Sequence, residues 1–256
     1  GNIANDVANA GGDSLRVAVI RLPRISNTTD ADALASEPGV SLRFADRPDD
    51  LVDADLVVIP GTRATVNDLA WLHQRGLAQA LRDRVRKNRP TIGICGGFQM
   101  LAGVIDDPYE SGAGMVSGLD LLPVRVRFLR EKTLALPEGR ALGEYVRGYE
   151  IHHGVVDVEG GEPFLDGCRV GAVFGTTWHG IFENDGFRRA FLTEVAATIG
   201  SGFKVAPDTN FAQVRQSRLD LLGDLVADHL DTSAIWRLIE NGPTCGLPFI
   251  SSGAFA

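Results

Sequence analysis

The chain has 256 residues, of which 44% are hydrophobic and 23% charged, and its 33 acidic against 25 basic residues give a net charge of −8 at pH 7. This composition is typical of a globular protein large enough to bury a core without disulfides, and the acidic surplus argues against nucleic acid, whose phosphates bind clustered Lys and Arg. No apolar run approaches the roughly 20 residues that span a bilayer, the first residues lack a secretory leader, and three dispersed cysteines predict a reducing cytoplasm and no metal site.

Residues 1–14 are polar and predict a linker. The following segments alternate between short β-branched apolar runs and stretches of helical periodicity. The strands are predicted over Leu15–Ile20, Val40–Phe44, Ala54–Ile59 and Thr91–Ile94, and the helices over Thr65–Trp71, Gly76–Lys87 and Phe98–Gly103. This order predicts an α/β fold with a mostly parallel central sheet and helices on both of its faces.

The second half begins with Gly112–Val158, which is rich in Gly and in short alternating runs and predicts a small antiparallel addition. A late strand over Val170–Thr177 and a helix over Asn184–Ile199 follow. Apolar residues at helical spacing predict one long or broken helix over Thr209–Glu240, which closes a domain that runs from residue 15 to residue 241. Residues 242–256 predict a flexible tail.

The segment TIGICGGFQML carries the strongest local pattern in the chain. A buried strand leads directly into Gly93-x-Cys95-x-Gly97 and then into a helix, which is the layout of a nucleophile elbow with Cys as the nucleophile. The helix terminus is expected to favour a thiolate, and the Gly96 N–H to donate to an oxyanion. The alternative is that Cys95 is only a small buried apolar residue, the interpretation that we give to Cys168 and Cys245.

A thiol nucleophile needs a base, and the chain has five histidines. His179 follows an apolar strand and precedes Gly180, which predicts a position at the carboxyl edge of the sheet. His152 and His153 are the competing candidates. His73 and His229 lie in polar helical stretches and are expected at the surface.

TIGICGGFQML resembles the nucleophile segment of class I glutamine amidotransferases. Four further segments narrow the resemblance to the C-terminal amidotransferase domain of cobyric acid synthases, the CobB/CobQ type: VAVIRLPRISNTTDADAL, VVIPGTRATVNDLAWL, RGYEIHHG and WHGIFENDGFRRAFL. The resemblance covers about Leu15 to Leu230, and it implies the flavodoxin-like fold of class I amidotransferases.

The resemblance implies a glutaminase in which Cys95 attacks the side-chain amide of L-glutamine to form a thioester, while His179 moves the protons. The loop of Gly61 and Thr62 matches the family's oxyanion loop and would act together with Gly96. The wider family has His-x-Glu, but here Ile181 stands two residues after His179, so a Cys–His dyad is implied and the group that orients the imidazole is open.

Five more residues are candidates for the substrate site. Arg63 would steer the glutamine carboxylate or is a surface charge, and Gln99 lines the pocket or is structural. Tyr149, Glu150 and His152 in RGYEIHHG shape the active site, contact a synthetase domain, or belong to a strand at a domain face.

The resemblance also implies an N-terminal ATP-dependent synthetase domain, which would use ATP-Mg and the ammonia to amidate the b, d, e and g carboxylates of adenosylcobyrinic acid a,c-diamide. No GxxxxGK[ST] phosphate loop occurs in this chain, so we expect no cofactor here. The alternatives are the amidotransferase of a cobyrinic acid a,c-diamide synthase, that of a complex amidating a cell-wall lipid precursor, and a catalytically silent binding module.

Overall fold

The computed structural model describes residues 14–243 and residue 246. It divides the chain into two compact units, Gly1–Phe211 and Ala212–Ala256. The sequence predicts one domain over residues 15–241, and that boundary stays a prediction. The apolar residues at helical spacing near its end do lie on helices, where Leu221, Leu225 and Leu238 are exposed. The predicted linker, up to residue 13, and the predicted tail, apart from residues 242, 243 and 246, lie outside the described residues, as does Cys245.

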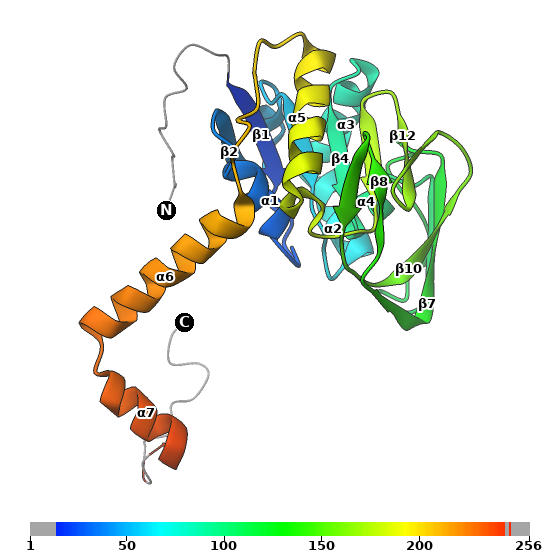
Figure 1. The fold of residues 1–256 in the computed structure, drawn as a ribbon. Coiled ribbons are helices and arrows are strands. Elements are labelled where there is room, and N and C mark those ends of the chain that lie inside the picture. The colour runs from blue at the N-terminus through cyan, green and yellow to red at the C-terminus, as the bar shows by residue number, and fades with distance from the viewer. Residues whose placement is uncertain (1–13, 244–245, 247–256) are drawn as a thin grey trace. The chain divides into compact units, whose positions relative to one another are not determined.

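A seven-stranded sheet in the order β11-β12-β13-β4-β3-β1-β2 forms the centre of the first unit (Figure 1). Five strands pair in parallel: β1 (Leu15–Ile20), β2 (Val40–Ala45), β3 (Leu56–Ile59), β4 (Thr91–Ile94) and β13 (Val173–Thr176). Two antiparallel strands extend one edge: β11 (Glu162–Phe164) and β12 (Gly167–Val170). The predicted single strand over Val170–Thr177 is thus interrupted, because Gly171 turns the chain at a φ of +55°.

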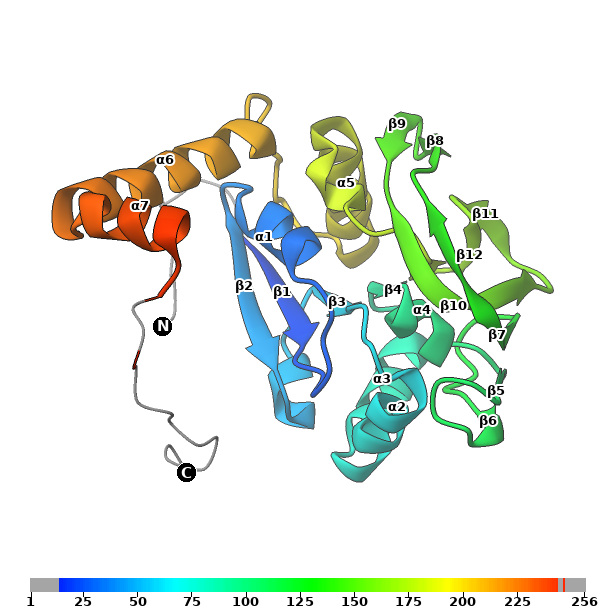
Figure 2. The same cartoon turned by 90° about the horizontal axis from the view of Figure 1, so that it is seen from below.

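Helices cover both faces of this sheet, because alternate residues of each strand point to opposite sides. Val17 and Val19 of β1 pack in one apolar cluster with α1 and α5, while Ala18 and Ile20 pack in another with α2 and α3. Figure 2 shows these helix pairs on opposite sides of the sheet. The helices of the first unit are α1 (Thr29–Ala35), α2 (Thr65–Gln74), α3 (Leu77–Arg86), α4 (Gly96–Met100) and α5 (Asp185–Ile199), with 3-10 turns η1 (Pro48–Leu51) and η2 (Ile181–Glu183). The predicted parallel α/β architecture is confirmed.

The middle of the chain forms a second sheet in the order β10-β7-β5-β6 and a separate hairpin of β8 and β9. Their bounds are β5 (Val104–Asp107), β6 (Gly114–Ser117), β7 (Val124–Ala135), β8 (Glu138–Ala141), β9 (Glu144–Arg147) and β10 (Glu150–Val158). Most pairs are antiparallel, as predicted, but β5 and β7 pair in parallel, because β6 and the loop that follows it return the chain to the same end of the sheet.

The second unit contains α6 (Phe211–His229), which starts at the unit boundary, and α7 (Thr232–Asn241). Of the two predicted possibilities, a long or a broken helix, the structure has the broken one, and the Asp231 side chain caps α7 by accepting the Ala234 N–H at 2.9 Å. Within the described residues, no helix is both long and apolar enough to cross a membrane.

Candidate active site

The tight turn between β4 and α4 holds Cys95 in a strained backbone conformation, with φ 51° and ψ −114°. Its glycine neighbours are required by close contacts: a Cβ on Gly93 would lie 2.7 Å from the Phe98 backbone, and one on Gly97 would lie 2.0 Å from the Ile59 carbonyl oxygen. Such strain in a strand–turn–helix unit is typical of a nucleophile elbow. The helix starts at Gly96, two residues before the predicted start, and ends at Met100, before the predicted end at Gly103.

The Cys95 thiol is a neutral group in this setting. It is 4% exposed, and its burial raises its pKa to about 12, while the Gly96 N–H that hydrogen-bonds to it acts in the opposite direction. The negative charges of Glu110, Asp166 and Glu150 raise the pKa further. The thiolate predicted from the helix terminus is therefore not the resting form, because α4 has five residues and desolvation outweighs its dipole.

His179 reaches the same edge of the sheet as Cys95. Strands β4 and β13 pair in parallel with Ile94 opposite Thr176, and the Cys95 N–H donates to the Thr176 carbonyl at 2.8 Å. His179 lies three residues beyond Thr176 and is 3% exposed. Burial, and secondarily the charge of His152, lower its pKa to about 4, so the imidazole is neutral and able to accept a proton at neutral pH.

The Tyr149 side chain stacks on the His179 ring, with 5.1 Å between ring centroids and 17° between the planes. The two residues also form an antiparallel bridge, in which each N–H donates to the other's carbonyl, at 2.9 and 3.1 Å. Because Ile181 stands two residues after His179, the sequence leaves open which group orients the imidazole. The stacking contact with Tyr149 is part of the answer, because it restrains the imidazole without being a carboxylate.

The loop after β3 lies against both Cys95 and His179. A Cβ on Gly61 would lie 2.4 Å from His179 Cε1, and a Cβ on Gly96 would lie 3.1 Å from the Thr62 nitrogen. The Thr62 hydroxyl anchors the loop by donating to the buried Asp68 carboxylate. The backbone nitrogens of Thr62 and Gly96 are thus neighbours at the turn that carries the thiol, an arrangement that suits an oxyanion hole.

The remaining candidates occupy different places. Arg63 is exposed. Gln99 is buried, where its amide donates to the Gly154 carbonyl at 3.2 Å and accepts from the Thr65 hydroxyl at 3.2 Å, so it joins α4 to β10 and α2. A side chain with both amide atoms bonded to protein serves first as a structural link.

Glu150 and His152 lie on β10, facing the site. The Thr177 hydroxyl donates to Glu150 Oε1 at 2.6 Å, and His152 Nε2 lies 3.5 Å from the same oxygen. Both ring nitrogens of His152 are buried without a hydrogen-bond partner among the described residues. His153, the other competing base, instead places Nδ1 3.1 Å from the Leu129 carbonyl.

The structure also locates the residues to which the sequence assigns no chemistry. Cys168 is fully buried in the core, and His73 and His229 are exposed, as predicted. Asn27 and Asp30, in the segment SNTTD, contact Tyr149 and the turn after His179. Sequence reasoning missed both, because their partners lie more than 100 residues away along the chain.

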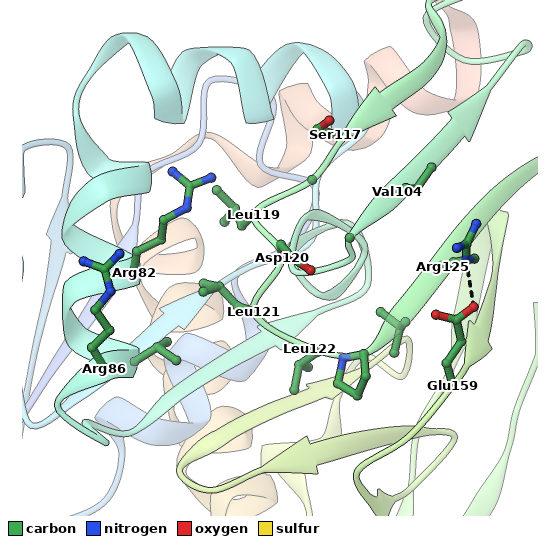
Figure 3. A pocket seen from close by; sticks show the side chains of 15 residues that line it. Arg82, Arg86, Val104, Ser117, Leu119, Asp120, Leu121, Leu122, Arg125 and Glu159 are labelled. Carbon is green, nitrogen blue, oxygen red and sulfur yellow. Dashed lines mark hydrogen bonds and ion pairs between the residues drawn. The ribbon is translucent and has the colours of Figure 1, made fainter.

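A surface hollow of about 840 Å³ lies elsewhere, with Arg82, Arg86, Leu119 and Leu122 in its lining (Figure 3). Neither Cys95 nor His179 lines it. Among the described residues, no group of three or more His, Cys, Asp or Glu side chains is arranged to hold a metal ion.

Comparison with known families agrees with the elbow and the fold. Residues 16–187 match the family model of the CobB/CobQ-like glutamine amidotransferase domain. Because this match covers more than half of the chain, the chain belongs to that family.

Curated relatives narrow the comparison. The cobyric acid synthase of Streptomyces avermitilis is 65% identical over 244 residues, which are 95% of this chain and 49% of that protein. The cobyric acid synthases of Streptomyces coelicolor and Frankia casuarinae are 63% and 57% identical, over 95% and 96% of this chain and 49% of each protein. The chain therefore spans about half the length of the curated relatives it matches.

Solved structures share the fold at low sequence identity. A protein described as a glutamine amidotransferase superposes with a TM-score of 0.56 at 21% identity, covering 71% of this chain and 98% of its own. PurLQS from Thermotoga maritima gives a TM-score of 0.52 at 16% identity, covering 71% of this chain and 99% of its own. These likenesses support the class I amidotransferase fold.

Proposed function

We propose that the chain hydrolyses L-glutamine and supplies ammonia for amide synthesis. The observation that supports this most is the arrangement at one sheet edge: Cys95 at a strained turn, His179 beyond the neighbouring strand, and the loop of Gly61 and Thr62 against both. A buried thiol, a neutral imidazole and two adjacent backbone donors are the parts that acyl transfer from an amide requires.

The proposed reaction starts from a neutral Cys95 thiol and a neutral His179 imidazole. Cys95 Sγ attacks the side-chain amide carbon of glutamine as His179 takes the thiol proton, and the N–H groups of Gly96 and Thr62 stabilise the charge on the amide oxygen. His179 then gives the proton to the departing nitrogen, which leaves as ammonia, and a glutamyl thioester remains. Water, deprotonated by the same imidazole, attacks the thioester, glutamate departs, and Sγ recovers its proton.

The roles of the outer residues follow from their positions. Arg63 is exposed beside the loop and is available to attract the glutamine carboxylate. Glu150 and His152 lie close enough to act on the charges of the site, since both influence the pKa of the catalytic pair. Gln99 acts indirectly, by fixing α4.

We further propose that this domain works within a cobyric acid synthase, because relatives of that name cover the chain at up to 65% identity and are about twice as long. The ammonia would pass to an ATP-dependent synthetase domain, which uses ATP and Mg to amidate the b, d, e and g carboxylates of adenosylcobyrinic acid a,c-diamide. Free buried thiols at Cys95 and Cys168 fit a reducing, cytoplasmic setting.

The first experiment tests glutamine hydrolysis by the chain itself. Glutamate release is measured, together with covalent labelling by the glutamine analogue 6-diazo-5-oxo-norleucine, for the wild type and Cys95→Ser. We expect label on Cys95 and release of glutamate, both lost in Cys95→Ser. Absence of both in the wild type, alone and joined to a synthetase half, would favour the silent binding module.

A second experiment tests the partner and the corrinoid substrate. The matching half of the Streptomyces avermitilis cobyric acid synthase is replaced by this chain, and amidation of the a,c-diamide is followed with glutamine or with ammonium as nitrogen source. We expect glutamine-dependent amidation that fails in the Cys95→Ser chimera but persists with ammonium. A chimera that uses ammonium but never glutamine contradicts the proposed pairing.

A further inference from the structure

The position two residues after His179 holds an apolar side chain. Ile181 is 0% exposed and packs in the cluster that contains Phe182, Phe187 and Phe191. It offers no acceptor to the imidazole, so the orientation of His179 must come from other groups.

A buried carboxylate from a distant helix holds the turn that follows His179. Asp30, in the first turn of α1, is 7% exposed. Its Oδ2 accepts the Gly180 N–H at 2.9 Å and its Oδ1 accepts the Phe182 N–H at 3.1 Å. The two oxygens therefore bind the backbone on both sides of Ile181, where Gly180 turns at a φ of +73°.

The same short segment also fixes the ring that stacks on His179. The Asn27 amide nitrogen donates to the Tyr149 hydroxyl, and the Asn27 carbonyl oxygen accepts the Thr29 N–H at 2.6 Å. Asn27 and Asp30 are three residues apart, so one segment restrains both the stacked ring and the turn after the imidazole.

The ionised form of Asp30 does not stabilise the folded protein. Burial raises its pKa to about 6, and the charge of Glu183 adds to this, although the Phe182 and Gly180 N–H groups lower it. For an acid with a raised pKa in the folded state, the stabilising contribution is present at low pH and is lost as the pH rises through about 6. The negative charge of Glu183 acts on Asp30, and the charges of Asp30, Glu183 and Cys95 act on Tyr149 in the same region. A carboxylate that costs stability at neutral pH, yet holds two N–H groups beside a base, suggests a functional reason.

We propose that Asp30 is a positioning residue for His179, which takes the place of a third triad carboxylate by holding the backbone of the turn rather than the imidazole itself. Asn27 supports it through Tyr149. The inference rests on the proposed role of His179 as the base, and it adds the group that orients this base.

The test compares Asp30→Asn, Asp30→Ala and the control Asp32→Ala, which removes an exposed carboxylate from the same helix. Asn keeps the size of the side chain but has one acceptor for two N–H groups. We expect Asp30→Asn to lower kcat for glutamine hydrolysis about tenfold, with KM changed less than about twofold, because the interaction is with the base rather than with the substrate. Asp32→Ala should match the wild type.

A double-mutant cycle separates positioning from general damage. In the His179→Asn background, Asp30→Asn should change the rate of labelling of Cys95 by 6-diazo-5-oxo-norleucine less than about twofold, because a residue that acts through His179 has nothing left to position. Equal fold-losses in both backgrounds, or full kcat in Asp30→Asn, would overturn the proposal. If Asp30→Ala does not fold, Asp30→Asn alone decides the outcome.

A measurement that does not depend on turnover separates the test of this positioning role from the test of the proposed function. The pKa of His179, followed by NMR of isotopically labelled histidine, should rise from about 4 toward its ordinary value in Asp30→Ala and Asp30→Asn, because a released ring becomes hydrated. An unchanged His179 pKa in both variants would sink the positioning role even if the wild type hydrolyses glutamine. If the His179 pKa shifts in the Asp30 variants but the wild type does not hydrolyse glutamine, the positioning role stands and the proposed glutaminase function is rejected.

Discussion

The two halves of the proposed site are built in opposite ways. On the side of the proposed nucleophile, five consecutive residues, Gly93 to Gly97, set the turn, and a Cβ added to any of their three glycines would lie less than 3 Å from another atom. On the base side, His179 is held by Tyr149, which is 30 positions earlier, and its turn by Asp30, which is about 150 positions earlier.

This difference shows what each half depends on. The conformation of Cys95 is set by local steric contacts, so it is retained as long as the neighbouring backbone can pack closely against the glycines. The orientation of His179 is a property of packing between α1, Tyr149 and the segment after β13, so it changes whenever any of these shifts. The nucleophile half should therefore fail by loss of folding, and the base half by loss of rate.

The largest expected effect breaks the nucleophile half. Gly97→Ala places a methyl group 2.0 Å from the Ile59 carbonyl oxygen, which neither backbone can avoid without moving β3 from α4. We expect a loss of about 3 kcal/mol in the free energy of unfolding, measured in urea, and no glutaminase activity. The matched control is Gly160→Ala, whose added Cβ meets its nearest atom, in Pro123, at an ordinary 3.6 Å. A Gly97→Ala protein as stable as this control contradicts the steric account.

The next effect removes the proposed base and leaves the fold intact. His179→Asn should reduce kcat for glutamine hydrolysis about 10³-fold, because proton transfer from the thiol and to the leaving nitrogen is lost. Its urea midpoint should stay close to that of the wild type. The control is His73→Asn, at an exposed histidine. Near wild-type turnover in His179→Asn would transfer the role to His152 or His153, the competing candidates on β10.

A smaller effect tests the restraint on the base. Tyr149→Leu removes the stacked ring and its hydrogen bond from Asn27, whereas Tyr149→Phe removes only the hydrogen bond. We expect kcat to fall about threefold in Tyr149→Phe and about 15-fold in Tyr149→Leu, since a stacked pair contributes about 1 kcal/mol, or about fivefold, in addition to the hydrogen bond. Steady-state rates of glutamate release give both values. Equal losses in the two variants would show that the ring itself does not restrain His179.

The sequence by itself determined the parts of this protein that depend on near neighbours. The short β-branched runs predict β1, β3 and β4 because strands buried on both faces are apolar throughout, and the glycines around Cys95 predict its turn because only glycine fits there. The apolar strand before His179 predicts the carboxyl edge of the sheet because parallel strands end together, and His179 lies three residues beyond the Thr176 end of β13.

Only the tertiary structure decided the rest, because burial and contacts between distant segments are set by how the whole chain packs. Asp30 carries no spacing relative to His179 that a motif search would use. The helix terminus predicts a thiolate at Cys95, but the depth at which the thiol is buried reverses that preference. Likewise, helical periodicity predicts α6 and α7, but not that the first compact unit ends at Phe211. Helical periodicity shows which residues lie on one face of a helix, but it does not show what packs against that face.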